Sequence, residues 1–141
     1  MSNLTTIPYL MFNGRCQEAI EFYQSAIGAE LEMMMRFSDS PEPMPEGSIP
    51  PGFEDKVMHA SIKVGNSTIW LSDGNDTKTE FKGFSISIGS DSAAELHSIF
   101  DKLANGGEVI MPMSKTFWSE AFGMVKDKFG ISWMLGVNSQ S

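Results

Sequence analysis

The chain has 141 residues, enough for one domain that can bury a hydrophobic core without disulfides or metal ions. Its formal net charge of -8 disfavours partners that need clustered Lys and Arg, so we expect it to bind neither nucleic acid nor an anionic membrane. It has one Cys, no apolar run long enough to span a membrane, and no signal-peptide pattern at its start. These features predict a soluble, cytoplasmic protein.

The first half of the sequence predicts a strand, a helix and three further strands. Apolar residues recur at helical spacing along the helix, and Gly28 stops it. The last two strands form a hairpin around Gly65-Asn66. The predicted strands are residues 6–12, 30–37, 56–64 and 67–72, and the predicted helix is residues 14–30.

A proline-rich segment, residues 38–55, separates the second and third of these strands. Its prolines lack the backbone donors that a sheet or helix uses, so we expect a long exposed loop. Met44, Ile49 and Phe53 are its apolar residues. We expect these three to pack against a second chain or over the mouth of a pocket, which would make the loop an arm or lid.

The second half repeats the same plan. Its helix begins after an Asp or Ser cap and ends at Asn105-Gly106-Gly107. The predicted strands are residues 84–89, 108–113, 121–127 and 131–137, and the predicted helix lies within residues 90–107.

Single residues also recur between the halves. The pairs 78 positions apart are Phe22 and Phe100, Ala26 and Ala104, Gly28 and Gly106, and Glu30 and Glu108. The pair Leu71 and Leu135 is 64 positions apart, and the difference of 14 residues is about the extra length of the proline-rich segment. We therefore predict a duplicated βαβββ unit.

This architecture resembles the vicinal oxygen chelate superfamily. Two stretches support the resemblance, YLMFNGRCQEAIEFYQSAIGAE near the start and FWSEAFGMVKDKFGISWML near the end. This superfamily contains glyoxalase, bleomycin-resistance and extradiol-dioxygenase proteins, and the PhnB-like branch is the most similar part of it. The resemblance covers nearly the whole chain. It implies an α+β fold in which two tandem βαβββ modules, at about 5–74 and 81–138, form one glyoxalase-like domain over residues 1–141. A curved mixed sheet would surround a pocket, helices would cover the outer face, and two chains would form a homodimer.

The metal enzymes of this superfamily place their ligands on the first and last strand of each module. The matching positions here are Pro8, Trp70, about Ser85, and Met134. None of these residues offers an imidazole, carboxylate or thiolate group, so we expect neither a metal nor another cofactor. The branch has also carried a name for ubiquinone-type methyl transfer, yet the sequence shows no feature of a methyl-donor nucleotide site.

Alternation along three strands separates a packing face from an open face. The predicted packing residues are Ile69, Leu71, Phe84, Ile86, Ile88, Ile131, Trp133 and Leu135. Trp70, Ser85 and Met134 then face a cavity lined by aromatic, thioether and hydroxyl groups.

Two residues are candidates for acid–base chemistry. His59 shares a strand face with Ser61 and is the stronger candidate, although one His on a strand is more often structural. Glu120 follows Trp118 on a loop that we expect to border the pocket, although an exposed Glu is common. We predict that Ser61 and Trp118 contact the ligand.

Two further residues have a functional and a structural interpretation. Arg36 is placed to bind either a ligand anion or a protein carboxylate. Cys16 lies at the start of the first helix, where a thiolate is favoured, but no His is near it in the sequence. We include Arg36 among the ligand-binding candidates and expect Cys16 to be structural.

Three functions therefore stay open. The leading hypothesis is a metal-free protein that binds a small apolar or aromatic molecule. The second is an enzyme of lyase, isomerase or dioxygenase type, with a relocated metal site or with His59 as acid and base. The third is a module that binds a partner protein through the proline-rich segment.

Overall fold

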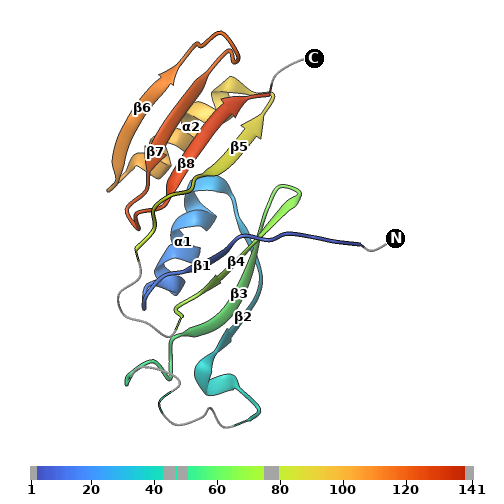
Figure 1. Ribbon diagram of the computed structural model, residues 1–141, viewed down its shortest axis with the longest axis vertical. Helices are drawn as coiled ribbons and strands as arrows, with labels where there is room; N and C mark the ends of the chain where they lie inside the picture. The colour runs from blue at the N-terminus through green and yellow to red at the C-terminus, as the bar shows by residue number, and fades with distance from the viewer. Residues whose placement is uncertain (1–2, 43–46, 48–50, 75–79, 139–141) are drawn as a thin grey trace. The chain divides into compact units, whose positions relative to one another are not determined.

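The computed structural model describes residues 3–42, 47, 51–74 and 80–138 (Figure 1). The chain divides into two compact units, Met1–Thr79 and Glu80–Ser141. Each unit contains four strands and one α-helix in the order strand, helix and three strands, which confirms the predicted α+β class with two βαβββ modules. That the two units form one domain stays a prediction.

The first unit contains a four-stranded mixed sheet in the order β1-β4-β3-β2. β1 pairs with β4 in parallel, and the other neighbours are antiparallel. The helix α1 contacts β2 and β3. The elements are β1 (Tyr9–Met11), α1 (Cys16–Ile27), β2 (Glu30–Arg36), the short 3-10 helix η1 (Phe37–Asp39), β3 (Val57–Val64) and β4 (Ser67–Ser72).

The helix α1 begins and ends at groups that satisfy its terminal backbone atoms. Its first N–H, from Cys16, donates to the Asp73 carboxylate at 2.7 Å. At its end Gly28 adopts a left-handed conformation with φ of 68°, which a residue without Cβ takes at little cost. The buried side chains of α1 are Cys16, Ala19, Ile20, Tyr23 and Ala26. This buried stripe agrees with the helical spacing in the sequence.

The second unit contains a mixed sheet in the order β5-β8-β7-β6. The helix α2 lies against one face of this sheet (Figure 1). Ser92 caps α2, because its hydroxyl accepts the N–H of Glu95 at 3.1 Å. The elements are β5 (Ile86–Ser90), α2 (Ala93–Ala104), β6 (Glu108–Ser114), β7 (Phe122–Lys126) and β8 (Ser132–Val137).

One strand begins later than the sequence predicts. β5 starts at Ile86, which pairs with Trp133 of β8. Ser85 lies before the strand and is exposed, and the side chain of Phe84 is 44% exposed. The prediction that Phe84 packs under the sheet is therefore wrong, because β8 itself begins at Ser132 and offers no strand partner so far back.

The equivalent positions of the two modules support the duplication. Gly28 and Gly106 both follow a helix and both have positive φ, 68° and 80°. Leu71 in β4 and Leu135 in β8 are both fully buried. The recurring residues therefore occupy matching places in each βαβββ unit.

The proline-rich segment falls only partly within the described residues. Phe53 is buried in the first unit, and its ring lies near Gly14. Met44 and Ile49 lie outside the described residues. Within the described part of the chain, no helix has the length and apolar character needed to cross a membrane.

Candidate functional site

Each sheet has one face covered by its helix and a second, open face. Ile69 and Leu71 in β4, and Trp133 and Leu135 in β8, are at most 5% exposed. The packing face predicted by alternation is confirmed for these four residues. Trp70 and Met134, which alternate with them, lie on the open faces.

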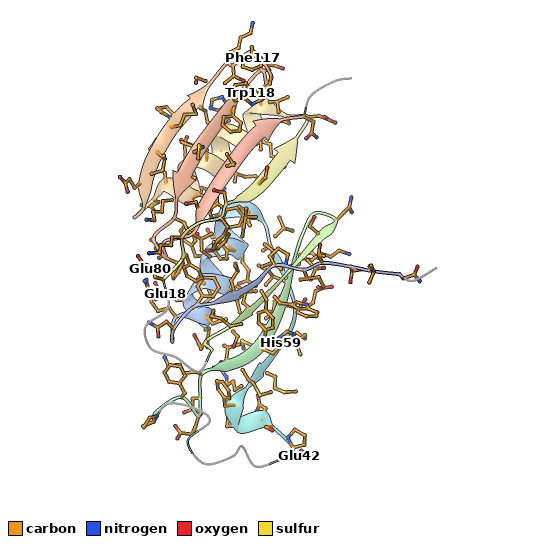
Figure 2. The ribbon with its side chains drawn as sticks, in the orientation of Figure 1. Glu18, Glu42, His59, Glu80, Phe117 and Trp118 are labelled. Carbon is orange, nitrogen blue, oxygen red and sulfur yellow. The ribbon has the colours of Figure 1, made fainter. Side chains whose placement is uncertain are left out.

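Three rings from three strands meet on the open face of the first sheet. They are Tyr9 of β1, His59 of β3 and Trp70 of β4, with ring centroids separated by 5.1 to 5.7 Å and edge-to-face orientations. The Tyr9 hydroxyl lies 2.8 Å from Nδ1 of His59. Figure 2 shows His59 on this sheet. We call these three residues the ring cluster.

Tyr9 was not among the residues predicted from the sequence. It is the register partner of Trp70 in the parallel pair of β1 and β4, so it shares the face of Trp70. The sequence places Pro8, one residue earlier, at the position that matches a metal ligand, whereas Tyr9 is the residue that lies opposite Trp70. The carbonyl of Pro8 instead accepts the N–H of Trp70 at 2.9 Å.

The chemistry of the ring cluster depends on the protonation of the Tyr9 phenol. Burial raises the pKa of Tyr9, and the Ser72 hydroxyl opposes part of this shift. The phenol therefore keeps its proton at neutral pH, and its hydroxyl forms a hydrogen bond with Nδ1 of His59 whose direction depends on the imidazole tautomer. Because the Tyr9 hydroxyl occupies Nδ1, Nε2 is the nitrogen through which His59 can exchange a proton with a bound molecule.

Polar and thioether groups lie beside the ring cluster. Ser61 pairs with Trp70 in the register, and its hydroxyl donates to the Glu32 carboxylate at 2.9 Å. Met33 and Met35 on β2 are the register partners of Ser61 and His59, so they share the open face. Aromatic rings, two thioethers and one carboxylate therefore lie close together on this face.

Arg36 is bound to the protein itself. One terminal nitrogen of its guanidinium donates to the carbonyl of Asp55 and the other to the side chain of Gln17, both at 2.7 Å. These bonds connect the end of β2 to α1 and to the segment before β3. The oxygen atoms that bind the guanidinium are neutral, so the arrangement is neither a carboxylate pair nor a prepared anion site. We leave Arg36 out of the proposed site.

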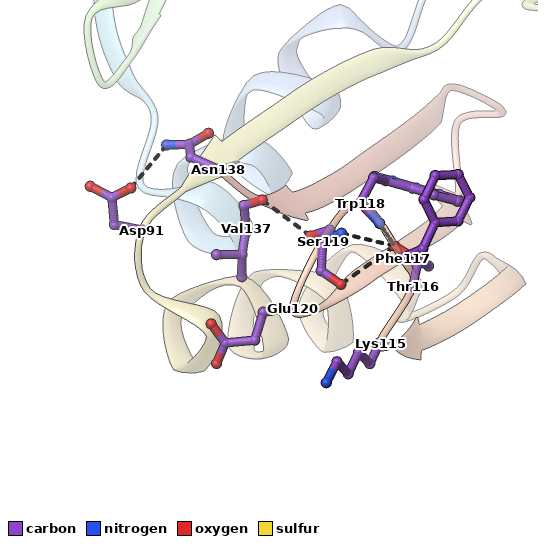
Figure 3. A pocket seen from close by; sticks show the side chains of 9 residues that line it. All are labelled: Asp91, Lys115, Thr116, Phe117, Trp118, Ser119, Glu120, Val137 and Asn138. Atoms are coloured by element: carbon purple, nitrogen blue, oxygen red, sulfur yellow. Dashed lines mark hydrogen bonds between the residues drawn. The ribbon is translucent and has the colours of Figure 1, made fainter. Parts of the chain in front are cut away.

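The second unit contains a cavity of about 500 Å³, and only residues of this unit line it (Figure 3). Phe117 is 97% exposed and Trp118 is 48% exposed. Figure 2 shows both side chains at one end of the unit. The charged and aromatic lining residues are Asp91, Lys115, Phe117, Trp118 and Glu120.

Hydrogen bonds fix the loop that carries Trp118. The Thr116 hydroxyl accepts the N–H groups of Trp118 and Ser119 at 3.3 and 3.0 Å. The Ser119 hydroxyl donates to the carbonyls of Ala121 and Val137, which joins the loop to the end of β8. The Trp118 ring is thereby held at the cavity, and it also contacts Phe122 at 5.4 Å between centroids.

Met134 belongs to a row of thioethers on the open face of the second sheet. Its register partners are Ser87 on β5 and Met124 on β7, and Met124 in turn pairs with Met111 on β6. Three methionines therefore lie side by side across three strands. This row agrees with the predicted thioether lining.

The structure places the predicted site residues in two groups. His59, Ser61 and Trp70 lie together on the open face of the first unit. Trp118 and Glu120 line the cavity of the second unit. His59 and Glu120 belong to different units.

The residues at the superfamily's ligand positions do not fit a divalent metal. Trp70, Ser85 and Met134 offer no imidazole, carboxylate or thiolate, and Tyr9 takes the place expected for Pro8. Within residues 3–42, 47, 51–74 and 80–138, no three His, Cys, Asp or Glu side chains come together to hold a metal ion. No chemical step is therefore assigned to a metal here.

The two modules with their open faces define a glyoxalase-like fold. Solved structures of the same fold include a glyoxylase/bleomycin resistance protein/dioxygenase domain from Frankia sp. EAN1pec, which is 13% identical with a TM-score of 0.68 and 98% coverage of both chains. The family model described as 3-demethylubiquinone-9 3-methyltransferase matches residues 4–136, and the chain belongs to this PhnB-like family.

Several relatives resemble the chain over nearly its whole length. The protein YjdN from Escherichia coli (strain K12) is 38% identical over 141 residues, which covers 94% of this chain and 95% of that protein. The crystal structure of PA1353 from Pseudomonas aeruginosa is 41% identical, with a TM-score of 0.83 and coverage of 98% and 100%. The PhnB protein from Bacillus cereus is 28% identical, with a TM-score of 0.77 and coverage of 96% and 100%.

Proposed function

We propose that this protein binds a small aromatic or otherwise apolar molecule, without a bound metal, at the ring cluster of its first sheet. The observation that carries the proposal is the meeting of Tyr9, His59 and Trp70 on a sheet face that α1 does not cover. Aromatic rings offer large contact areas at a low entropy cost, and planar ligands stack on them or meet them edge to face.

Two further features support this ligand class. Met33 and Met35 are flexible and polarisable, so they adapt to the outline of an apolar molecule. The family description also names a ubiquinone derivative, whose planar ring agrees with an aromatic-lined site. A homodimer is part of the proposal, because the edge strands β2 and β6 carry exposed apolar side chains that a second chain could cover. A solution mass near 15.5 kDa would contradict the dimer.

Trp70→Ala tests the ring cluster directly. We expect the variant to stay folded and to bind 1,4-naphthoquinone and 2-naphthol roughly tenfold more weakly, because one aromatic wall is lost. Binding is measured by ligand-observed NMR, and Trp70→Phe is the matched control that keeps a ring. Treatment with a chelator should leave the wild-type affinity unchanged.

Two outcomes would count against the binding proposal. If Trp70→Ala unfolds the protein while Trp70→Phe and wild type bind no compound of a broad aromatic set, the ring cluster is packing rather than a site. If wild-type binding appears only after a divalent metal is added, the metal-free part of the proposal is wrong.

The hydrogen bond between Tyr9 and His59 favours a second candidate function, proton transfer to and from the bound molecule. Such an enzyme would exchange an acidic C–H of its ligand with solvent deuterium. We expect exchange catalysed by wild type to be lost in His59→Gln and reduced in Tyr9→Phe. Equal exchange in wild type and His59→Gln would leave the protein as a binder alone.

A further inference from the structure

The cavity of the second unit carries two opposite charges that the protein does not neutralise. Lys115 and Glu120 both line it (Figure 3). Neither forms an ion pair with another residue that the structure describes. Because the two side chains border one cavity without pairing with each other, both charged groups remain available to a ligand.

The third charged residue of the cavity has a role within the protein. Asp91 accepts a hydrogen bond from the side chain of Asn138 at 3.3 Å. It also lies just before Ser92, the cap of α2, where the helix dipole stabilises a negative charge. The pair that is left for a ligand is therefore one ammonium and one carboxylate.

An apolar wall stands beside this pair of charges. The half-exposed Trp118 ring is held by its loop and by Phe122, and Val137 also lines the cavity. A rigid ring of this kind suits an aromatic or aliphatic side chain. A volume of about 500 Å³ lies within the range of small-molecule sites.

We propose that this cavity binds a zwitterionic α-amino acid with an apolar side chain. Lys115 would bind the ligand carboxylate, Glu120 would bind the ligand ammonium, and Trp118 would contact the side chain. A ligand with a single charge would leave one protein charge without a partner, so the site favours molecules that carry both. The whole chain has a net charge of -8, which disfavours the approach of simple anions.

Three related probes separate the two charge contacts: L-phenylalanine, 2-phenylethylamine without the carboxylate, and 3-phenylpropionate without the ammonium. We expect L-phenylalanine to bind in the millimolar range or tighter, and each analogue to bind roughly threefold to tenfold more weakly. Binding is measured from backbone amide shifts in 15N NMR spectra, which should change at residues 115–120.

Two charge-removing variants assign each contact. Glu120→Gln should weaken L-phenylalanine binding and leave 3-phenylpropionate unchanged. Lys115→Met should weaken L-phenylalanine binding and leave 2-phenylethylamine unchanged. The matched controls are Glu95→Gln and Lys102→Met on α2, which remove the same charges away from the cavity and should bind as wild type does.

Several results would overturn the assignment. Equal binding of L-phenylalanine and 2-phenylethylamine would remove the role of Lys115, and no binding at about 10 mM would remove the site. A loss of binding in the control variants would point to a general charge effect. The test is independent of the ring cluster, because Trp70→Ala should leave L-phenylalanine binding intact, whereas Trp118→Leu should weaken it.

Discussion

Replacing Asp127 by Ala should lower the free energy of unfolding of the second unit by roughly 3–5 kcal/mol, a large part of the 5–15 kcal/mol typical of a domain. One oxygen of this carboxylate accepts the N–H groups of Phe129 and Ile131 at 2.9 and 3.1 Å. The other accepts Nε1–H of Trp133 at 2.8 Å. Asp127 is 3% exposed and Trp133 is 1% exposed, so water does not replace these bonds in the native state.

The carboxylate also determines the shape of the β7–β8 turn. Its two backbone bonds hold Phe129 to Ile131 in the turn, and its bond to Trp133 fixes the largest buried side chain of the unit. Truncation to Ala leaves two buried donors and the partly buried N–H of Phe129 without this acceptor, each buried donor at a cost of about 1–3 kcal/mol before any relaxation. The turn and the core of the second unit should therefore loosen together.

Thermal unfolding followed by tryptophan fluorescence checks this result, because buried Trp133 reports on the second unit. The transition midpoint should fall by about 10–20 °C in Asp127→Ala. Asp127→Asn should lie between Asp127→Ala and wild type, since an amide retains one acceptor oxygen. Asp101→Ala, at an exposed position of α2, is the matched control and should stay within about 0.5 kcal/mol of wild type. A similarly small effect of Asp127→Ala would refute the argument.

Periodicity predicted most of the fold because it records which residues face a core. The β3–β4 hairpin and both helices lie where the sequence places them, to within a few residues at each end. The start of β5 was missed, because Phe84 has the residue type of a packing position but no strand partner. Local patterns contain no information about where a neighbouring strand ends.

The candidate site was predicted only where alternation was sufficient. Trp70 and Met134 were placed on open faces correctly, since each lies between buried residues of its own strand. Tyr9 was missed because its place depends on the register between β1 and β4, which are about sixty residues apart. The placement of Lys115 and Glu120 around one cavity likewise depends on the folded loop rather than on spacing.

At Cys16, a residue that is distant in the sequence opposes the effect of the helix N-terminus on the pKa of the thiol. A helix N-terminus normally favours a thiolate, and the sequence places Cys16 there. In the structure Asp73, which is 57 positions away, accepts the N–H of Cys16 and brings a negative charge to the same helix end. Burial, and after it the charge of Asp73, raise the pKa of the Cys16 thiol. The predicted structural role agrees with this environment.

Replacing Asp73 by Ala should destabilise the first unit by roughly 2–4 kcal/mol. Asp73 is 1% exposed, and its two oxygens accept the N–H of Cys16 at the start of α1 and the N–H of Val57 at the start of β3. Both elements begin at this carboxylate, so its loss leaves two buried donors without their acceptor. Chemical denaturation measures the change, and Asp55→Ala, at an exposed position of the same unit, is the matched control.

Asp73→Asn gives a second readout that general destabilisation does not predict. Removing the negative charge should lower the pKa of Cys16, although burial still holds it above the usual value. A group whose native pKa is raised stabilises the fold below its unfolded pKa, and this stabilisation is lost as pH rises further. Stability should therefore fall above about pH 8.5 in both proteins, and in Asp73→Asn this fall should end at a lower pH, because the native pKa of Cys16 is lower there. An end of the fall at the same pH in both proteins would show that Asp73 does not control the thiol.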